Sequence, residues 1–305
     1  MMTTLFHRSA ASCWFAGKPL VWGLLLLVLF APFARADKLD EIRQRGTLIV
    51  GVKKDVALWG FMDPQSGELK GLEPDLARLV AENLGVKLSL VGLLTSERTD
   101  AVLSGKVDML IATLSDTPER QKSMTLVLPH YQASGVNLLA RKSDAFKSWG
   151  ELRNRRVCTR RGAAYNRPIT VDYGVDLIAL YGNAMSLASL RDGRCSAMLD
   201  IDISIVAMLQ SPQWAQNFEM PLPTLYNVLW SIALAPTERA GALEKTVSKL
   251  VLGWHRDGVL QALERHWGIP SSVYLKNMHE AWSRKLGGKW FCGDEVTSGT
   301  PLECL

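Results

Sequence analysis

In the first part of the chain, the pattern of apolar and polar positions switches between one that is typical of strands and one that is typical of helices. The run TLIVGV (47–52) is short and β-branched, which predicts a strand, and EPDLARLVAENLG (73–85) has helical spacing with a glycine stop. VKLSLVGL (86–93) and VDMLIATL (107–114) predict two further buried strands, with a helix near 96–105 between them. Strands that alternate with helices of this length predict βαβ units and a mostly parallel sheet.

The same alternation starts again later in the chain. A second set of strands, separated by helices, is predicted at 155–160, 176–181 and 195–201. Extended, proline-punctuated chain (216–236) then leads into a helical segment (240–268). We expect an α/β fold of two lobes, each a mostly parallel sheet flanked by helices, joined by two crossovers. The expected division is a signal peptide (1–36), a discontinuous first lobe (37–138 plus 232–270), a second lobe (139–231) and a C-terminal extension (271–305).

The first 36 residues differ in kind from the rest. Arg8 and Lys18 precede the apolar run PLVWGLLLLVLFAPF, and the small-x-small sequence Ala34-Arg35-Ala36 follows it. This order is typical of a secretory signal peptide. The alternative is a membrane anchor, but the run is shorter than the roughly 20 residues that a spanning helix needs. We expect cleavage after Ala36 and a periplasmic protein.

Charge argues against a nucleic-acid-binding protein. The 305 residues carry a formal net charge of +5. Residues 1–36 contain three basic residues and no acidic ones, so the rest holds 32 basic against 30 acidic residues, a net charge of +2. No stripe of Lys and Arg remains that would attract a phosphate backbone.

Four cysteines remain after residue 36, namely Cys158, Cys195, Cys292 and Cys304. An even number in an exported chain suggests two disulfides. Of the three possible pairings we favour Cys158–Cys195, beside predicted strands of one segment, and Cys292–Cys304, which bracket a polar tail. Free buried thiols are the alternative.

Candidate chemistry gathers at the predicted strand ends. The five histidines stand at no metal-ligand spacing, and no nucleophile elbow, P-loop or dinucleotide fingerprint occurs, so neither a metal nor a cofactor is expected. Ligands of open α/β sheets bind outside the carboxyl ends of the strands. The residues at or just beyond those ends are Lys53, Trp59, Thr113, Ser115, Gly162, Asp200 and Asp202.

The sequence SDTPER (115–120) predicts an anion contact. Thr117 can cap a helix whose first position is Pro118, where a missing N–H costs nothing. Arg120, one turn in, can make a two-pronged contact to a carboxylate beside the helix N-terminus. The alternative is a capped helix with a solvated arginine.

Several stretches, in order, resemble one known family. GVKKDVALWGFMDPQSGELKGLEPDLARLVAENLGVKLSLV and GKVDMLIATLSDTPERQKSM resemble the N-terminal lobe of the family 3 solute-binding proteins, the periplasmic amino-acid receptors of ABC importers. SWGELRNRRVCTRRGAAYN and DGRCSAMLDIDIS resemble parts of the family's second lobe. The resemblance covers roughly residues 45 to 270.

The resemblance implies a two-lobed protein that closes on a free amino acid. Arg120 would clamp the α-carboxylate, assisted by Ser115 and the backbone near Thr113. Trp59 would pack over the ligand, unless it is a core tryptophan. An acid on the second lobe would hold the α-ammonium.

The second lobe departs from the family pattern. Without a gap, the key aspartate falls on Ile201, between Asp200 and Asp202. We favour Asp202, because the following ISIVAML then matches the family's helix, although either acid could be a helix cap.

Two further positions depart from the pattern. The family's hydroxyl residues after Gly162 are replaced by Ala163 and Ala164, which leaves backbone N–H donors only. Leu72 stands where an aromatic residue is common.

Two classes of function follow. The first is a receptor without catalysis, expected to be a monomer, that delivers an amino acid or similar small carboxylate to a membrane permease. The second is an exported enzyme on the same fold, such as a prephenate- or arogenate-type dehydratase, which would need an acid or base in the cleft. Lys53, Lys54 and Asp55 are candidates, but charged residues at a strand end more often recognise ligands or face solvent. We expect the receptor, and Lys53 is weak support for an acidic ligand side chain.

Overall fold

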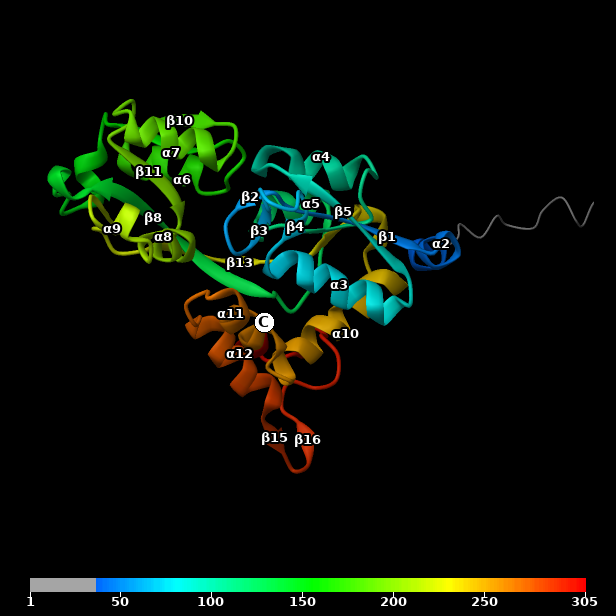
Figure 1. Cartoon of the computed structure of the whole chain (residues 1–305). Coiled ribbons are helices and arrows are strands. Elements are labelled where there is room, and N and C mark those ends of the chain that lie inside the picture. The colour runs from blue at the N-terminus through cyan, green and yellow to red at the C-terminus, as the bar shows by residue number, and fades with distance from the viewer. Residues whose placement is uncertain (1–36) are drawn as a thin grey trace, which may run out of the picture. The chain divides into compact units, whose positions relative to one another are not determined.

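The computed structural model describes residues 37–305, so the predicted signal peptide lies outside the described residues. Two β-sheets flanked by helices form the framework (Figure 1). The first sheet has the strand order β5 (Lys87–Leu93), β1 (Thr47–Lys53), β6 (Met109–Ile111), β14 (Ala233–Leu234) and β7 (Thr125–Leu126). The second has the order β10 (Asp176–Leu180), β9 (Arg156–Arg160), β11 (Ala197–Ile201), β8 (Gln132–Arg141) and β12 (Phe218–Glu219), and β13 (Leu225–Trp230) also pairs with β8. This confirms the predicted α/β fold.

Both sheets are mixed rather than mostly parallel. Strands β5, β1 and β6 are parallel, as are β10, β9 and β11. Strand β14 runs antiparallel to β6, and β8 runs antiparallel to β11 and β13. The chain passes from the first sheet to the second through residues 127–131 and returns through residues 231–232. Because it returns in the opposite direction, the strands next to these two connections run antiparallel to their neighbours.

One predicted boundary differs from the strand pairing. The expected division at residues 138 and 139 falls inside β8, all of which belongs to the second sheet. Its residues are almost all buried, the polar ones included, so the sequence pattern alone does not show on which side of the connection they pair.

Helices flank both sheets. On the first sheet α3 (Leu72–Leu84) packs against β1 and β5, and α4 (Arg98–Leu103) against β1 and β6. The predicted end of α3 is confirmed, because Gly85 adopts a φ of 69° that a left-handed cap requires. The second sheet is flanked by α6 (Asn166–Tyr173), α7 (Asn183–Arg191) and α8 (Asp202–Leu209). The remaining α-helices are α2 (Lys38–Arg45), α5 (Pro118–Ser123), α9 (Pro212–Ala215), α10 (Ala242–Arg256), α11 (Val259–Trp267) and α12 (Val273–Ser283).

Short elements complete the framework. A small sheet contains β2 (Asp55–Val56), β3 (Gly60–Met62) and β4 (Leu69–Lys70), and a hairpin at the C-terminal end contains β15 (Lys285–Leu286) and β16 (Lys289–Trp290). The 3₁₀ turns are η1 (Thr95–Glu97), η2 (Lys142–Asp144), η3 (Trp149–Leu152), η4 (Pro236–Glu238) and η5 (Leu302–Cys304). Among the helices of residues 37–305, none combines the length and hydropathy needed to cross a membrane.

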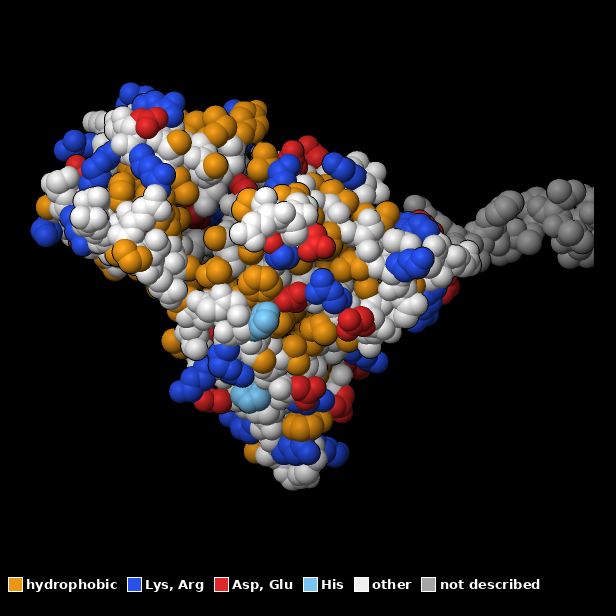
Figure 2. All heavy atoms as spheres, in the orientation of Figure 1, with side chains coloured by type: hydrophobic (Ala, Val, Ile, Leu, Met, Phe, Trp, Pro, Cys, Tyr) orange, Lys and Arg blue, Asp and Glu red, His pale blue; other side chains and the backbone are white. Residues whose placement is uncertain are grey.

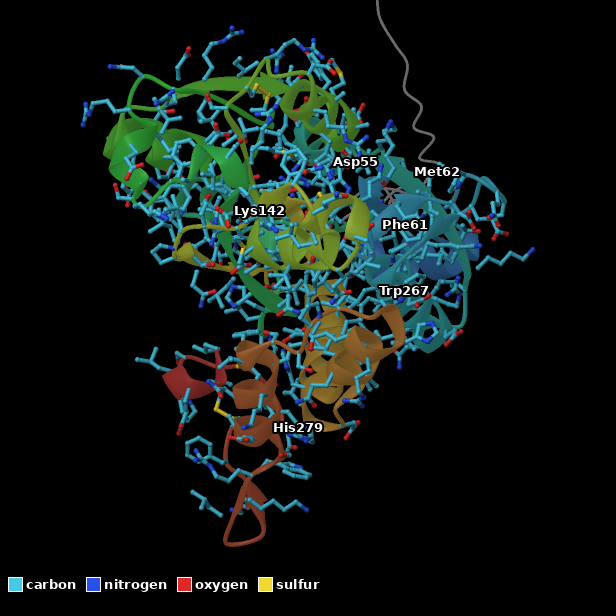
Figure 3. All side chains as sticks on the ribbon, turned by 60° about the vertical axis from the view of Figure 1, so that its left-hand side comes forward. Asp55, Phe61, Met62, Lys142, Trp267 and His279 are labelled. Carbon is cyan, nitrogen blue, oxygen red and sulfur yellow. A yellow bond between two sulfur atoms is a disulfide. The ribbon has the colours of Figure 1, made fainter. Side chains whose placement is uncertain are left out.

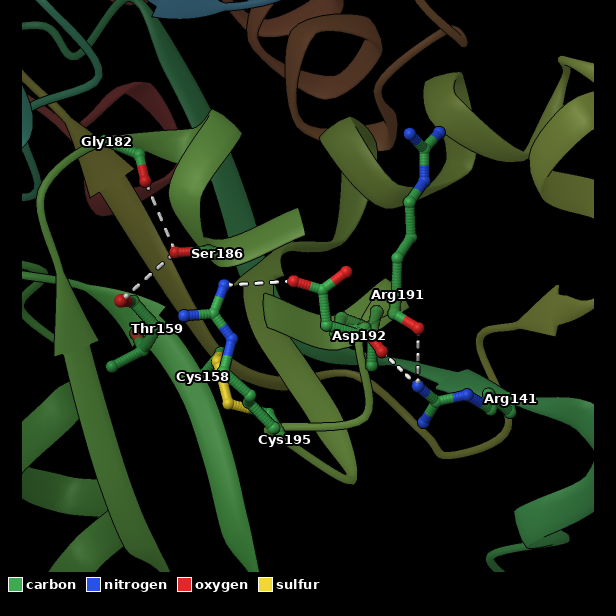
Figure 4. Close-up of a disulfide and its surroundings, with 10 residues drawn as sticks. Arg141, Cys158, Thr159, Gly182, Ser186, Arg191, Asp192 and Cys195 are labelled. Carbon is green, nitrogen blue, oxygen red and sulfur yellow. Dashed lines mark hydrogen bonds and ion pairs between the residues drawn. A yellow bond between two sulfur atoms is a disulfide. The ribbon is translucent and has the colours of Figure 1, made fainter. Parts of the chain in front are cut away.

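Two disulfides are present, in the pairings expected from the sequence. Cys158 on β9 and Cys195 just before β11 have Cα atoms 5.6 Å apart, and both are buried (Figure 4). Cys292 and Cys304 have Cα atoms 5.9 Å apart and pack against Trp282 of α12, whose Nε1 donates to the Cys304 carbonyl at 3.1 Å. The first disulfide ties two neighbouring strands of the second sheet together, and the second closes the C-terminal segment onto α12.

Candidate functional site

Buried charged side chains gather where strands of both sheets end. Lys53 is the last residue of β1, Arg160 the last of β9, and Asp200 lies near the end of β11. Their charges are close enough that each of the three affects the pKa of a charged residue nearby. We call the following six residues the charged cluster: Lys53, Asp55, Glu73, Arg98, Arg160 and Asp200.

The predicted helix start at SDTPER is confirmed. Thr117 Oγ1 accepts a hydrogen bond from the backbone N–H of Arg120 at 3.3 Å, and Pro118 occupies the first position of α5. The Arg120 guanidinium turns back, and its Nη1 donates to the Ser115 carbonyl at 2.7 Å. Among residues 37–305 no carboxylate lies within ion-pair distance of Arg120. Burial lowers its pKa, against the opposing effect of Asp116. Arg120 is therefore a partly buried cation with no ion-pair partner.

Thr113 has an unusual backbone held by buried side chains. Its φ is 46°, a left-handed value that costs a residue with a Cβ about 1 kcal/mol or more. Its N–H donates to the Tyr131 hydroxyl at 3.0 Å and to Glu73. Burial raises the pKa of Glu73 to about 7, although the bonds from Tyr131 and Thr113 oppose this. The Thr113 N–H predicted to assist a ligand thus has protein partners.

Arg98 joins the two sheets and was not predicted. Its Nε donates to the Thr95 carbonyl at 3.0 Å and its Nη1 to the Ala112 and Thr113 carbonyls at 2.8 and 2.6 Å. Its Nη2 reaches the Gly162 carbonyl, across the sheets, at 3.4 Å. Burial, together with the neighbouring cations Arg120 and Arg160, lowers the pKa of Arg98 to about 9.

The backbone at Gly162 strongly favours glycine at this contact. It has a φ of 79°, and an added Cβ would lie 3.0 Å from the Ser96 Cα. The N–H of the following Ala163 donates to the Arg160 carbonyl at 3.3 Å. The backbone donor of Ala163 that we expected to face a ligand is therefore used inside the turn.

Lys53 is fully buried with three partners. Its Nζ lies 2.8 Å from Asp55 Oδ1, 2.9 Å from Thr95 Oγ1 and 3.3 Å from the Leu93 carbonyl. Burial lowers the pKa of Lys53 to about 7, against the opposing effect of Asp55. Asp55 Oδ2 in turn accepts the backbone N–H of Asn183 from the second sheet's α7 at 3.0 Å. This chain of contacts is a second link between the sheets.

The two candidate acids have different surroundings. Asp200 is completely buried and forms an ion pair with Arg160, and its Oδ1 also accepts the Ile201 N–H at 2.7 Å. Asp202 is half-buried, and its Oδ1 accepts from Ser134 Oγ at 2.6 Å and from the Ile203 N–H at 2.7 Å. No cation in the described part of the chain pairs with Asp202. Of the two carboxylates, Asp202 is the one without a positive partner.

Trp59 lies inside the protein. Its side chain is 1% exposed and meets Trp230 edge to face, with ring centroids 4.8 Å apart. Its Nε1 has no hydrogen-bond partner among residues 37–305. An indole N–H usually finds a partner when buried, so this donor is left unsatisfied inside the core, of which Trp59 is a member.

Several orphaned polar atoms lie around the second-sheet half of the cluster. Arg160 Nη1, Asp200 Oδ2 and the Tyr165 hydroxyl are buried without a hydrogen-bond partner in the described residues. Ion pairing with Asp200 raises the pKa of Arg160 although burial acts against it, and burial raises that of Asp200. No group of three or more His, Cys, Asp or Glu side chains in residues 37–305 is placed to hold a metal ion.

Comparison with known protein families adds independent information to this geometry. The model of the bacterial extracellular solute-binding proteins, family 3, matches residues 48–270. The chain belongs to this family. The predicted resemblance is thereby confirmed, and with it the interpretation of the chain as a solute-binding protein.

The relatives are distant in sequence, but the similarity extends over half of the chain or more. The L-cystine-binding protein TcyJ of Escherichia coli is 24% identical over 82% of this chain and 95% of that protein. A glutamine-binding protein of Geobacillus stearothermophilus is 28% identical over 54% of this chain and 64% of that protein.

Solved structures share the fold. ArgBP from T. maritima superposes with a TM-score of 0.69 at 22% identity, covering 76% of this chain and 99% of that chain. The ancestral amino acid-binding protein AncCDT-1, a precursor of cyclohexadienyl dehydratase, has a TM-score of 0.67 at 24% identity over 75% of this chain and 98% of its own.

Sequence reasoning missed four members or neighbours of the cluster: Glu73, Arg98, Tyr131 and Arg160. Arg98 and Arg160 were accessible to the rule that singled out the other strand ends, since each stands at or just after the end of a strand. Glu73 and Tyr131 carry no such signal, because one lies in the first turn of a helix and the other in a connection.

Proposed function

We propose that the protein is a periplasmic receptor that binds a free amino acid, or a similar small carboxylate, between its two sheets and delivers it to the membrane permease of an ABC importer. The family assignment over residues 48–270 supports this proposal. The observation that carries the site is the pair of unmatched charges, the Arg120 cation beside the first sheet and the Asp202 carboxylate beside the second.

Each unmatched charge suits one end of an amino acid. The Arg120 guanidinium can offer a planar, two-pronged contact to the α-carboxylate, with Ser115 and Thr113 beside it. Asp202 can take the α-ammonium, since a buried ammonium needs a paired charge. Trp59 contributes a wall and an unused indole N–H.

The other predicted residues take supporting roles in this proposal. Lys53 has three protein partners, so it holds Asp55 and Thr95 in place instead of contacting the ligand. Asp200 compensates Arg160, and Gly162 with Ala163 shapes the turn at the second sheet.

The movement follows from the two connections between the sheets. We propose a first lobe of residues 37–131 and 232–270, a second lobe of residues 132–231, and a C-terminal extension of residues 271–305. A ligand that contacts both lobes at once would favour their closed arrangement by its differential affinity for it. We further propose a monomer, exported with a cleaved signal peptide.

Two relatives suggest the ligand class. The relatives described above are named for binding glutamine and L-cystine, both free amino acids. A thermal-shift screen of the twenty amino acids, cystine and related organic acids tests the proposal, because ligand at 100 times its Kd stabilises the folded state by about 2.7 kcal/mol. We expect a shift with at least one amino acid in the wild type and a much smaller shift with the same amino acid in Arg120→Met. No shift with any amino acid at 5 mM in a correctly folded sample would contradict it.

The alternative is an enzyme on the same fold, and AncCDT-1, an amino acid-binding protein that is a precursor of cyclohexadienyl dehydratase, is the reason to test for it. Incubation with prephenate, followed by absorbance of an aromatic product, separates the two readings. The receptor proposal predicts no product above the uncatalysed rate, and turnover that is lost when Lys53, Lys54 or Asp55 is replaced would support the enzyme.

A further inference from the structure

A cavity of about 560 Å³ lies between the small sheet at the first lobe and the helices of the second, and Asp55 is the one member of the charged cluster that lines it. We infer that this cavity, which we call the flank pocket, is a second binding site, for a small aromatic molecule that carries one hydroxyl or amide group. This inference does not depend on the proposed amino-acid site.

The body of the flank pocket is apolar and adaptable. Phe61 and Met62 from β3 and Trp267 from the end of α11 line one side (Figure 3). Leu187, Met208 and Trp214 line the other. Phe61 and Trp267 already meet edge to face at 6.1 Å, and Met62 is 45% exposed. Aromatic and methionine side chains pack favourably around another ring.

Two polar groups of the lining lack partners. Asn183, the first residue of α7, and Ser204, in α8, line the pocket, and they are only 8% and 7% exposed. Asn183 Oδ1 and Ser204 Oγ have no hydrogen-bond partner among residues 37–305. A buried polar atom without a partner costs about 1–3 kcal/mol, so a ligand group that reaches these atoms recovers part of that cost.

The size and charge of the pocket narrow the occupant. Its volume falls within the ~300–1,000 Å³ that small-molecule sites occupy. Its one acidic lining residue, Asp55, is already satisfied by Lys53 and the Asn183 N–H. Its one basic lining residue, Lys54, pairs with Glu97 at 3.5 Å. Both charges of the lining therefore have protein partners, and a neutral molecule with an aromatic body and a group that both donates and accepts fits it best.

The flank pocket is separate from the proposed amino-acid contacts. None of Arg120, Ser115 and Asp202 lines it. The Lys53–Asp55 pair lies between the two sites, with Lys53 fully buried in the cluster and Asp55 at the pocket wall.

The test uses two probes that differ by one hydroxyl, 4-fluorophenol and fluorobenzene, observed by ¹⁹F NMR line broadening on the full mature chain. We expect 4-fluorophenol to bind at least tenfold more tightly, since a site with unpaired polar groups discriminates against a ligand that lacks the hydroxyl. Equal binding of the two probes, or no broadening of either at 5 mM, would overturn the inference.

A pair of matched variants locates the binding. Ala184 and Ala188 are both exposed on α7, but only Ala184 lines the pocket. Ala184→Trp should weaken 4-fluorophenol binding more than tenfold, whereas Ala188→Trp should leave it within twofold of the wild type. Arg120→Met should also leave it unchanged, which separates this site from the amino-acid site. If Ala184→Trp has no effect while its circular dichroism and melting match Ala188→Trp, the flank pocket is not the binding site.

Discussion

The two halves of the candidate site are built in different ways around the same residue type. On the first-sheet side, Arg120 is held by contacts within six residues of chain, to Ser115 and the Thr117 cap, and has no carboxylate partner in residues 37–305. On the second-sheet side, Arg160 is completely buried and paired with Asp200, forty positions along the chain. A cation whose charge the protein already compensates belongs to the framework, and one that it leaves unmatched is available to a ligand.

The largest effect is expected from breaking the buried pair. Arg160→Met leaves the Asp200 carboxylate buried and uncompensated, which costs about 3–5 kcal/mol of folding free energy. The same substitution at Arg120 should cost less than about 1 kcal/mol, since it removes no ion pair. Urea unfolding measures both.

Two further variants control this experiment. Arg160→Met with Asp200→Asn removes the uncompensated charge and should recover part of the lost stability. Arg194→Met breaks the exposed pair with Asp192, whose side chains are about 60% accessible, and should change stability by less than about 1 kcal/mol. Equal losses at Arg120 and Arg160 would remove the distinction between the two halves.

The disulfide of the second sheet should matter nearly as much. Cys158–Cys195 joins the segments of β9 and β11, the strands that carry Arg160 and Asp200, and closes a separation of 37 residues (Figure 4). The chain-entropy relation gives about 4 kcal/mol for that loop and about 3 kcal/mol for the separation of 12 in Cys292–Cys304. We expect replacing the first pair by serine to lower both stability and ligand affinity, and replacing the second to lower stability alone. Unchanged affinity without Cys158–Cys195 would show that the second half does not depend on it.

On the first-sheet side of the site, the buried residues Glu73 and Lys53 should make the folding stability depend on pH. The pKa of Glu73 is raised from about 4.5 to about 7 in the folded chain. Between pH 4.5 and pH 7, Glu73 is therefore protonated in the folded state and ionised in the unfolded state. Stability from this group is full below pH 4.5 and decreases as the pH rises through 7, by on the order of 3 kcal/mol. Lys53 acts in the next window: its pKa is lowered to about 7 from 10.5, so stability from it rises between those values.

Glu73→Gln isolates the lower window, because the amide keeps an acceptor oxygen for Thr113 and Tyr131. Its stability relative to the wild type should increase between pH 4.5 and 7, as measured by urea unfolding at several pH values. Glu280→Gln, at an exposed carboxylate on α12, is the control. A pH-independent difference would contradict the buried, protonated state of Glu73.

The sequence predicted the parts of this molecule that rest on local signals. The helix start at Thr117-Pro118, the glycine end of α3 and the alternation of strands and helices depend on neighbouring residues, and the structure confirms them. The contacts of Arg98 and the pairing of Arg160 with Asp200 depend on which distant strands become neighbours. The position of β8 illustrates the same limit, since its apolar and polar residues are buried alike and their pattern suits either sheet.

Surface charge fits the same division between framework and site. On the face drawn in Figure 2, Lys and Arg side chains are interspersed with acidic and apolar ones and do not form one continuous stripe. The cation that we assign to ligand binding, Arg120, is partly buried on α5, and the buried cations Lys53 and Arg160 at the strand ends belong to the framework.

The most direct measurement is calorimetry with two ligands on two proteins. The ligands are the amino acid that gives the largest thermal shift and the amine with the same side chain but no carboxylate, and the proteins are the wild type and Arg120→Met. Since hydrogen bonds to charged groups contribute about 1.5–3 kcal/mol, we predict that the wild type binds the amino acid roughly 30-fold more tightly than the amine. Arg120→Met should bind both ligands with the weak affinity of the amine. If Arg120→Met keeps the wild-type preference for the carboxylate, Arg120 is not the residue that binds it.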